Sequence, residues 1–267
     1  MSARFLVAAE TAVAGTTAAA LASLPVSFGP AAGAPDVLAV AGDAGWTGRA
    51  AAAIRRGARG VLVVEPVAED PRAIAAEAAD AGAAVALDQA WAGNPVLTAP
   101  PAAALDAVAG AMANAVLCDS VAYALPGTAA GTLLTRHLCA VLACGVELSG
   151  LRMVRLQPGG YLLAGQLPGG APVALHGTTT AALPSTARIS VLTRTGRTDV
   201  TLPEASAAWP ADVRTVTADG STTLPTRFES AHRRSWLRLH AAVDSGNGLD
   251  DLERFAAVAA LVRNLTG

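Results

Sequence analysis

The chain has 267 residues, which is enough for one large domain or two modest ones, each with its own hydrophobic core. The formal net charge is −2 at pH 7, so no global field attracts nucleic acid or an anionic membrane surface. Hydrophobic residues make up 52% of the chain and mean hydropathy is +0.43, but much of this is alanine, and no apolar stretch reaches the roughly 18 to 20 residues of a membrane-spanning helix.

The chain contains no lysine. This excludes a Schiff-base lysine, a lysine general acid and a phosphate-binding P-loop lysine. Together with the alanine load, it is typical of a GC-rich, actinobacterial-type composition. The three cysteines, Cys118, Cys139 and Cys144, favour buried apolar packing in a reducing cytoplasm over a disulfide scaffold. Because Glu10 interrupts the apolar run that begins at Phe5, a secretion signal is not expected and the protein is predicted to be cytoplasmic.

Strands and helices alternate through the first third of the chain. Apolar runs and turn residues predict these elements, in chain order: strand 4–9, helix 16–23, strand 25–28, strand 36–41, helix 47–56, strand 61–64, a helix from about Pro71 to 81, and strand 83–87. Gly82 is a suitable helix stop. This alternation indicates a parallel sheet covered by helices on both faces.

A cluster of prolines at Pro95, Pro100 and Pro101 marks a domain boundary, and we predict domains at 1–97 and 98–267. The second domain is expected to contain helices at 102–115 and 132–144, strands at 116–123, 151–156, 161–167, 172–176, 187–194, 198–202 and 213–218, and two closing helices. The first closing helix is expected to begin at a capping box, Thr226 to Glu229, and the second covers 249–262. The pattern predicts an α+β domain with a large open, mainly antiparallel sheet.

Several segments resemble the Gfo/Idh/MocA-type oxidoreductases. Residues 57–68 (GARGVLVVEPVA) are similar to the strand and loop that carry Glu-Lys-Pro in that family, 83–95 to the next strand and its Asn-Pro exit, and 131–144 to the substrate-domain helix. The resemblance implies a Rossmann-like domain with NAD(P) at the carboxyl edge of its sheet and substrate between the domains. It also implies oligomers formed through the open sheet.

The cofactor turn departs from that pattern. A dinucleotide site needs glycines so that the backbone can approach the pyrophosphate at a helix N-terminus. The turn at 8–15 has a single glycine, Gly15, and places the carboxylate of Glu10 where the phosphate is expected. The segment 4–36 is also short, so one β-α unit is predicted to be missing. Gly15 and Pro66 remain the candidate cofactor-binding residues, and the cofactor is either none or NAD(P).

Three residues form the candidate acid/base set: Glu65, Asp88 and His137. Glu65 replaces the lysine of Glu-Lys-Pro, and Asp88 follows a strand at the edge where such sheets bind ligands. His137 lies on the helix that carries an Asp and a His in the family, and its side chain suits proton transfer near neutral pH. The alternative interpretations are a solvated carboxylate for Glu65 and a packed core histidine for His137.

Candidate substrate-binding residues are Gln89, Trp91, Arg136 and Tyr123. Trp91 could stack on a ligand and Arg136 could bind an anionic group. His232 and His240 are expected on a solvated basic helix face, and no metal-ligand spacing is present.

Three functions remain open. The first is cofactor-independent acid/base chemistry on a small molecule, in specialised metabolism. The second is NAD(P)-dependent reduction of an imine or carbonyl by a divergent branch, with thiazolinyl imine reductases similar in plan. The third is a non-catalytic partner of an active paralogue. The expected partners are a small-molecule substrate and a homodimer or hetero-oligomer formed through the open sheet, with no nucleic acid and no membrane.

Overall fold

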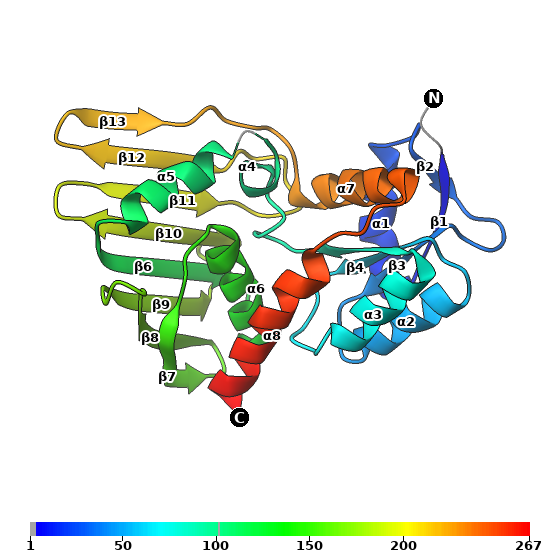
Figure 1. Ribbon diagram of the computed structural model, residues 1–267, viewed down its shortest axis with the longest axis horizontal. Helices are drawn as coiled ribbons and strands as arrows, with labels where there is room; N and C mark the ends of the chain where they lie inside the picture. Colours follow the sequence, from blue (N-terminus) through cyan, green and yellow to red (C-terminus); the bar gives the residue numbers. More distant parts are fainter. Residues whose placement is uncertain (1–3, 101) are drawn as a thin grey trace. The chain divides into compact units, whose positions relative to one another are not determined.

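A computed structural model describes residues 4–100 and 102–267 as two compact units (Figure 1). The first unit contains the residues up to Gln89 together with His232–Leu261. The second contains Ala90–Ala231 and Val262–Gly267. Two C-terminal helices thus belong mostly to the first unit, and the apolar face of the first of them packs on the first sheet.

The first unit is built on a five-stranded parallel sheet with the order β2-β1-β3-β4-β5. Its strands are β1 (Phe5–Ala9), β2 (Phe28–Pro30), β3 (Val37–Ala41), β4 (Gly60–Val64) and β5 (Ala84–Asp88). Its helices include α1 (Ala14–Ala22) after a 3-10 turn (Thr11–Val13), α2 (Trp46–Arg55) and α3 (Arg72–Ala81), which ends at Gly82 in the left-handed conformation. The predicted parallel, helix-covered sheet is confirmed. Successive strands continue outward on opposite sides of β1, so the topological switch point lies between β1 and β3.

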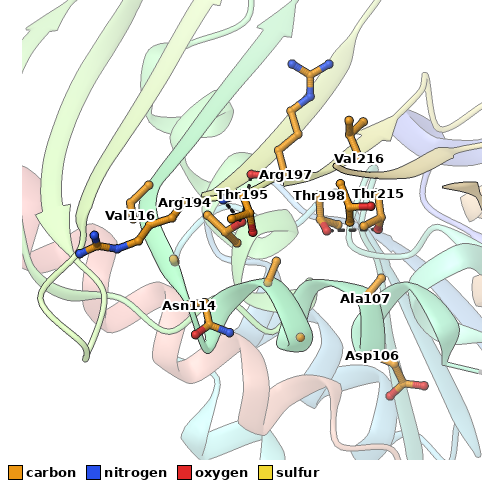
Figure 2. A pocket seen from close by; sticks show the side chains of 16 residues that line it. Asp106, Ala107, Asn114, Val116, Arg194, Thr195, Arg197, Thr198, Thr215 and Val216 are labelled. Carbon is orange, nitrogen blue, oxygen red and sulfur yellow. Dashed lines mark hydrogen bonds between the residues drawn. The ribbon is translucent and has the colours of Figure 1, made fainter. Parts of the chain in front are cut away.

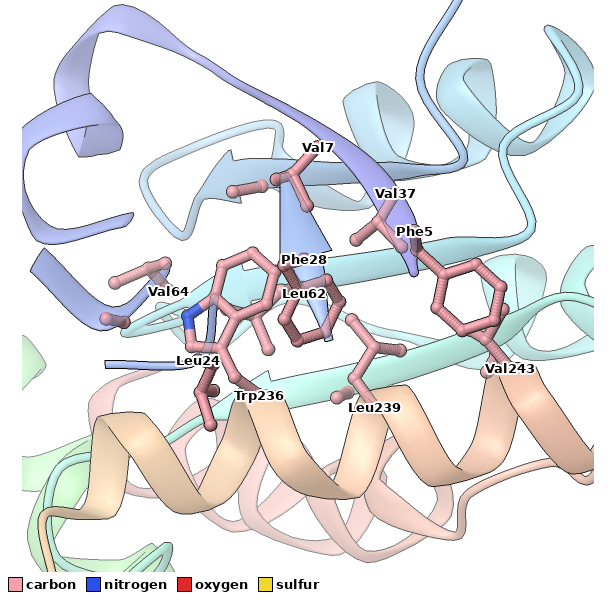
Figure 3. Close-up of a cluster of buried hydrophobic side chains, with 14 of the residues drawn as sticks. Phe5, Val7, Leu24, Phe28, Val37, Leu62, Val64, Trp236, Leu239 and Val243 are labelled. Atoms are coloured by element: carbon pink, nitrogen blue, oxygen red, sulfur yellow. The ribbon is translucent and has the colours of Figure 1, made fainter. Parts of the chain in front are cut away.

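One face of this sheet is covered by α1 and by α7 (Ala231–Ser245) (Figure 3). Trp236, Leu239 and Val243 share one side of α7 and pack on strand residues such as Phe28 and Leu62. The prediction that this helix begins at the Thr226 to Glu229 capping box is wrong, because the buried apolar stripe begins only at Ala231. On α8 (Asp251–Thr266), Phe255 packs edge-on against Trp46, with ring centroids 5.9 Å apart.

The second unit contains an eight-stranded mixed, mostly antiparallel sheet with the order β13-β12-β11-β10-β6-β9-β8-β7. Its strands are β6 (Ala115–Ala124), β7 (Ser149–Gln157), β8 (Gly160–Gln166), β9 (Pro172–Thr179), β10 (Thr186–Thr193), β11 (Arg197–Leu202), β12 (Asp212–Thr217) and β13 (Gly220–Thr223). Its helices are α4 (Pro95–Thr98), α5 (Ala103–Met112) and α6 (Ala130–Ala143). Only the β6–β9 pair is parallel, which confirms the predicted large, mainly antiparallel sheet.

The two faces of the second sheet differ. Helices α5 and α6 contact one face, and Cys118, Ser120 and Ala122 of β6 are buried on it. The alternating residues Asp119 and Tyr123 point to the other face and are half-exposed. Among residues 4–100 and 102–267, no helix is long and apolar enough to cross a membrane.

Candidate functional site

The carboxyl edge of the first sheet gathers three carboxylate residues and a glycine from the ends of four strands. Glu10, Gly42 and Glu65 directly follow β1, β3 and β4, and Asp88 is the last residue of β5. Because all strands of this sheet are parallel, their carboxyl ends lie along one edge, where open α/β sheets bind ligands. This edge is therefore the candidate site of the first unit.

Asp88 forms a close pair with His232, the second residue of α7. The Nδ1 atom of His232 lies 2.6 Å from Oδ2 of Asp88. Asp88 is only 1% exposed, and its Oδ1 is buried with no hydrogen-bond partner in the part of the chain that the structure describes. This contact fixes the His232 imidazole, a group that can accept or donate a proton, beside the carboxyl end of β5.

An ion pair stabilises the helices around this edge. Asp251, at the start of α8, accepts a hydrogen bond of 2.9 Å from the backbone N–H of Leu87, and its other oxygen pairs with Arg238 of α7. The side chains of Arg238 and Asp251 are 18% and 8% exposed. This network links α7 and α8 to β5 directly beside Asp88.

Glu65 adopts an unusual backbone conformation. Its φ is +55°, and it is the one non-glycine residue with a positive φ among the described residues. The segment is held by the Glu65 N–H, which donates to the Asp88 carbonyl at 2.9 Å, and by Gly42, where a Cβ would lie 2.5 Å from the Glu65 carbonyl. An L-residue in this region costs about 1 to 2 kcal/mol relative to its relaxed conformation. Such strain is often kept at functional sites.

Glu10 bridges the switch point between β1 and β3. Its Oε2 accepts the backbone N–H of Ala41 at 2.8 Å, and its Oε1 accepts from Nε of Arg49 at 3.1 Å. Arg49 also donates to the Ala41 carbonyl at 2.7 Å and pairs with Asp43. The protein's own side chains thus join the two strand ends at this point.

An ordinary dinucleotide site uses a glycine turn after the first strand for close backbone approach to the pyrophosphate. No residue from Glu10 to Gly15 has a positive φ, and a Cβ at Gly15 would meet no atom within 4 Å, so Gly15 does not provide close backbone approach to a ligand. The Glu10 carboxylate already occupies the Ala41 N–H and would repel a pyrophosphate. Pro66, the other predicted cofactor residue, follows the strained Glu65 and packs against Gly42.

In the second unit, His137 lies in a buried hydrogen-bond chain. The Ser120 hydroxyl donates to the Arg188 carbonyl at 2.8 Å, so it must accept from Nε2–H of His137 at 2.7 Å. Nδ1 of His137 then accepts from the Tyr161 hydroxyl at 2.7 Å. His137 is fully buried, and burial, with a smaller contribution from His176, lowers its pKa to about 3. This environment favours a structural role that joins α6 to β6 and β8.

The other predicted site residues do not form one cluster with His137. Tyr123 lies on the opposite face of the second sheet, beside a hollow of about 440 Å³ that Asp119 and His176 also line. Trp91 is 1% exposed, and Arg136 is half-buried on α6. Gln89 is the last residue of the N-terminal segment of the first unit, one residue after Asp88.

Sequence reasoning missed His232 and Arg49. The expectation that His232 and His240 lie on a solvated face is wrong, because His240 is 8% exposed against Phe5 and Phe28, and His232 contacts Asp88. A signal was present, since His232 precedes Trp236, Leu239 and Val243 at intervals of four, three and four residues, on one helix face.

A groove in the second unit lies between α5 and the strands β10 to β12 (Figure 2). Its volume is about 780 Å³, and its polar lining includes Arg194 and several threonines, with Thr198 and Thr215 hydroxyl oxygens 3.2 Å apart. No pair of titratable groups suited to proton transfer lines it. Among the described residues, no three His, Cys, Asp or Glu side chains are arranged to hold a metal ion.

No protein-family model matches the sequence, and no curated protein matches it either. Solved structures do resemble it. KijD10, a 3-ketoreductase from Actinomadura kijaniata in complex with NADP and TDP-benzene, is 16% identical, with a TM-score of 0.69 over 97% of this chain and 88% of that one. The UDP-N-acetylglucosamine 3-dehydrogenase GnnA from Acidithiobacillus ferrooxidans is 11% identical, with a TM-score of 0.70 over 98% and 97%. The chain has the fold of these two enzymes. At this identity the likeness establishes the architecture predicted from the sequence and nothing about the reaction.

Proposed function

We propose that this protein derives from the Gfo/Idh/MocA-type oxidoreductases and performs cofactor-independent acid/base chemistry on a small carbonyl compound. The observation that carries the proposal is the Asp88–His232 pair at the carboxyl edge of the first sheet. Glu65, on the neighbouring strand end, is the second titratable group of this site. Asp88 and Glu65 keep their predicted roles, while His232 takes the role predicted for His137.

The pair suits proton abstraction next to a carbonyl. When Nδ1–H of His232 donates to Asp88, the lone pair is on Nε2, which can accept a proton from the carbon beside the carbonyl. The electron pair of that C–H bond moves to form an enolate on the carbonyl oxygen. Return of a proton to the same carbon re-forms the carbonyl: from the same face it exchanges the proton with solvent, and from the opposite face it gives the epimer of the substrate. This sequence is redox-neutral and needs no nicotinamide.

The pair is tested by proton exchange, which does not require the natural substrate. In D₂O without nucleotide, we expect wild-type protein to exchange protons next to the carbonyl in at least one member of a panel of keto sugars and 2-oxo acids, followed by NMR. His232→Gln and Asp88→Asn should slow this exchange by about 10²-fold or more, the usual contribution of a positioned base. His176→Gln, on the exposed face of the second sheet, is the matched control. Equal exchange in all four proteins contradicts the proposal.

The strained conformation of Glu65 gives a separate prediction. Glu65→Gly should raise the free energy of unfolding by roughly 0.5 to 1 kcal/mol, because glycine adopts φ of +55° without a Cβ penalty. Glu65→Ala keeps that penalty and should not be stabilised. Urea denaturation measures both, and the same proteins should exchange substrate protons more slowly. A Glu65→Gly protein that is no more stable than Glu65→Ala contradicts the strain.

The fold favours a second candidate, NAD(P)-dependent reduction of a carbonyl or imine. KijD10 has this fold and was solved with NADP. Titration with NADPH, followed by nicotinamide fluorescence, separates this candidate from the first. Micromolar binding would favour the reductase.

A third candidate is a non-catalytic subunit that pairs with another copy or a paralogue. The face of the second sheet opposite α5 and α6 supports it, since Leu117, Val121 and Leu162 on that face are half-exposed. We propose that a homodimer or hetero-oligomer forms there. Light scattering of the purified protein measures the mass in solution.

A further inference from the structure

Parallel α/β sheets bind phosphate groups at the switch point and at helix N-termini along their carboxyl edge, because free backbone N–H groups point there. In this chain, a carboxylate of the protein lies at each of two such places. Glu10 is at the switch point between β1 and β3, and Glu69 is at the start of α2. Neither contact depends on the Asp88–His232 pair.

The Glu10 carboxylate makes the contacts that a bound phosphate oxygen would make. One oxygen accepts a backbone N–H from Ala41, and the other accepts from the Arg49 guanidinium. Arg49 is held in this position by the carbonyls of Ala41 and Ala44, at 2.7 and 2.8 Å. The guanidinium also pairs with Asp43, whose side chain is exposed. A guanidinium fixed by backbone carbonyls and paired with the Glu10 carboxylate is a preorganised anion site in which the protein's own carboxylate takes the place of the bound anion.

The start of α2 is occupied in the same way. Glu69, from the loop after β4, accepts the backbone N–H groups of Gly45 and Thr47, and its Oε2 also accepts from the Thr47 hydroxyl at 2.9 Å. Two of the backbone N–H groups at this helix start, those of Gly45 and Thr47, are therefore already bonded to a carboxylate of the chain.

We infer that Glu10 is a built-in anion that occupies the switch point in place of a ligand phosphate. The wild-type protein then has no phosphate site there, and loss of the Glu10 carboxylate exposes one, made of Arg49 and the Ala41 N–H. The ligand class for this latent site is a phosphate or pyrophosphate group, whether free or part of a dinucleotide.

Inorganic pyrophosphate and NADPH are the probes. Thermal unfolding of the full-length wild-type protein should be no higher in pyrophosphate than in chloride of equal ionic strength. Glu10→Ala should gain a ligand-dependent rise in its midpoint and bind pyrophosphate at least about tenfold more tightly than wild type, the effect of one freed charge-assisted hydrogen bond. The double variant Glu10→Ala/Arg49→Gln should lose this gain.

Two further variants make the result specific. Glu10→Gln keeps the side-chain volume and removes only the charge, so it tests the inference even if Glu10→Ala does not fold. Glu77→Ala is the matched control. Glu77 lies on α3 and pairs with Arg55, which is on α2 like Arg49 but away from the sheet edge. This variant should gain no pyrophosphate binding. Wild-type binding of pyrophosphate or NADPH that Arg49→Gln abolishes, or no gain in either Glu10 variant, overturns the inference. Neither result bears on proton exchange by Asp88 and His232.

Discussion

Between pH 8 and pH 5, the free energy of unfolding should fall by about 2 kcal/mol through His137 alone. Burial lowers the pKa of His137 to about 3 in the folded state, against an ordinary value of 6.5. Below pH 6.5 the unfolded chain therefore binds a proton that the folded protein excludes. The stabilising effect of neutral His137 is complete above pH 6.5 and is lost progressively as the pH falls toward 3.

His137→Gln isolates this contribution. The glutamine amide can donate toward Ser120 and accept from Tyr161, but it does not titrate. Between pH 8 and pH 5, the free energy of unfolding of this variant should therefore fall by about 2 kcal/mol less than that of wild type. Urea denaturation at several pH values measures the difference, in which the other titrating groups cancel. His176→Gln is the control and should change the slope much less than His137→Gln does, because His176 makes only the smaller contribution to the lowered pKa of His137. Parallel profiles for wild type and His137→Gln would show that His137 can take up a proton without unfolding.

Loss of the Asp251 carboxylate should have the largest effect on stability. Asp251→Ala leaves Arg238 without its partner in a mostly buried position and the backbone N–H of Leu87 without an acceptor. Removing one member of a buried ion pair typically costs about 3 to 5 kcal/mol, because the other charge remains desolvated. We expect about 3 kcal/mol here, since the Arg238 side chain is still 18% exposed.

The neighbouring residue supplies a matched control. Asp250 pairs with Arg254 on the surface of the same helix, and both side chains are more than half exposed. Asp250→Ala should cost no more than about 0.5 kcal/mol, as expected for an exposed pair four residues apart. Similar denaturation midpoints for the Asp250 and Asp251 variants would contradict the proposed link between α7, α8 and β5.

The sequence predicted the fold better than the site because fold signals are local. Apolar runs such as 61–64 mark buried strands, and Gly82 marks a helix end, within a few residues of the element itself. The hairpin strand Gly220–Thr223 was missed because all four residues are exposed and polar or glycine, so no alternation is present. The predicted helix start at Thr226 failed because a capping-box pattern can occur in a loop when no apolar face follows at once.

The site depends on pairs that are distant in sequence. Asp88 and His232 are 144 positions apart, and Glu10 and Arg49 are 39 apart. The repulsive position of Glu10 was predicted, but the Arg49 partner that neutralises it was not, since no local pattern relates β1 to α2. His137 suited an acid by residue type, whereas the structure shows that both its ring nitrogens are engaged inside the core.

The return of the chain to its first unit has a consequence during synthesis. The face of the first sheet that contains Phe28 and Leu62 is covered by Trp236 and Leu239 of α7, which the ribosome produces only after the whole of Ala90–Ala231. At ordinary translation rates, this delay is on the order of 10 s. The nascent N-terminal segment thus presents an apolar sheet face for that time. A chain that ends before α7 should therefore be retained by chaperones or aggregate, even though it contains every strand of both sheets.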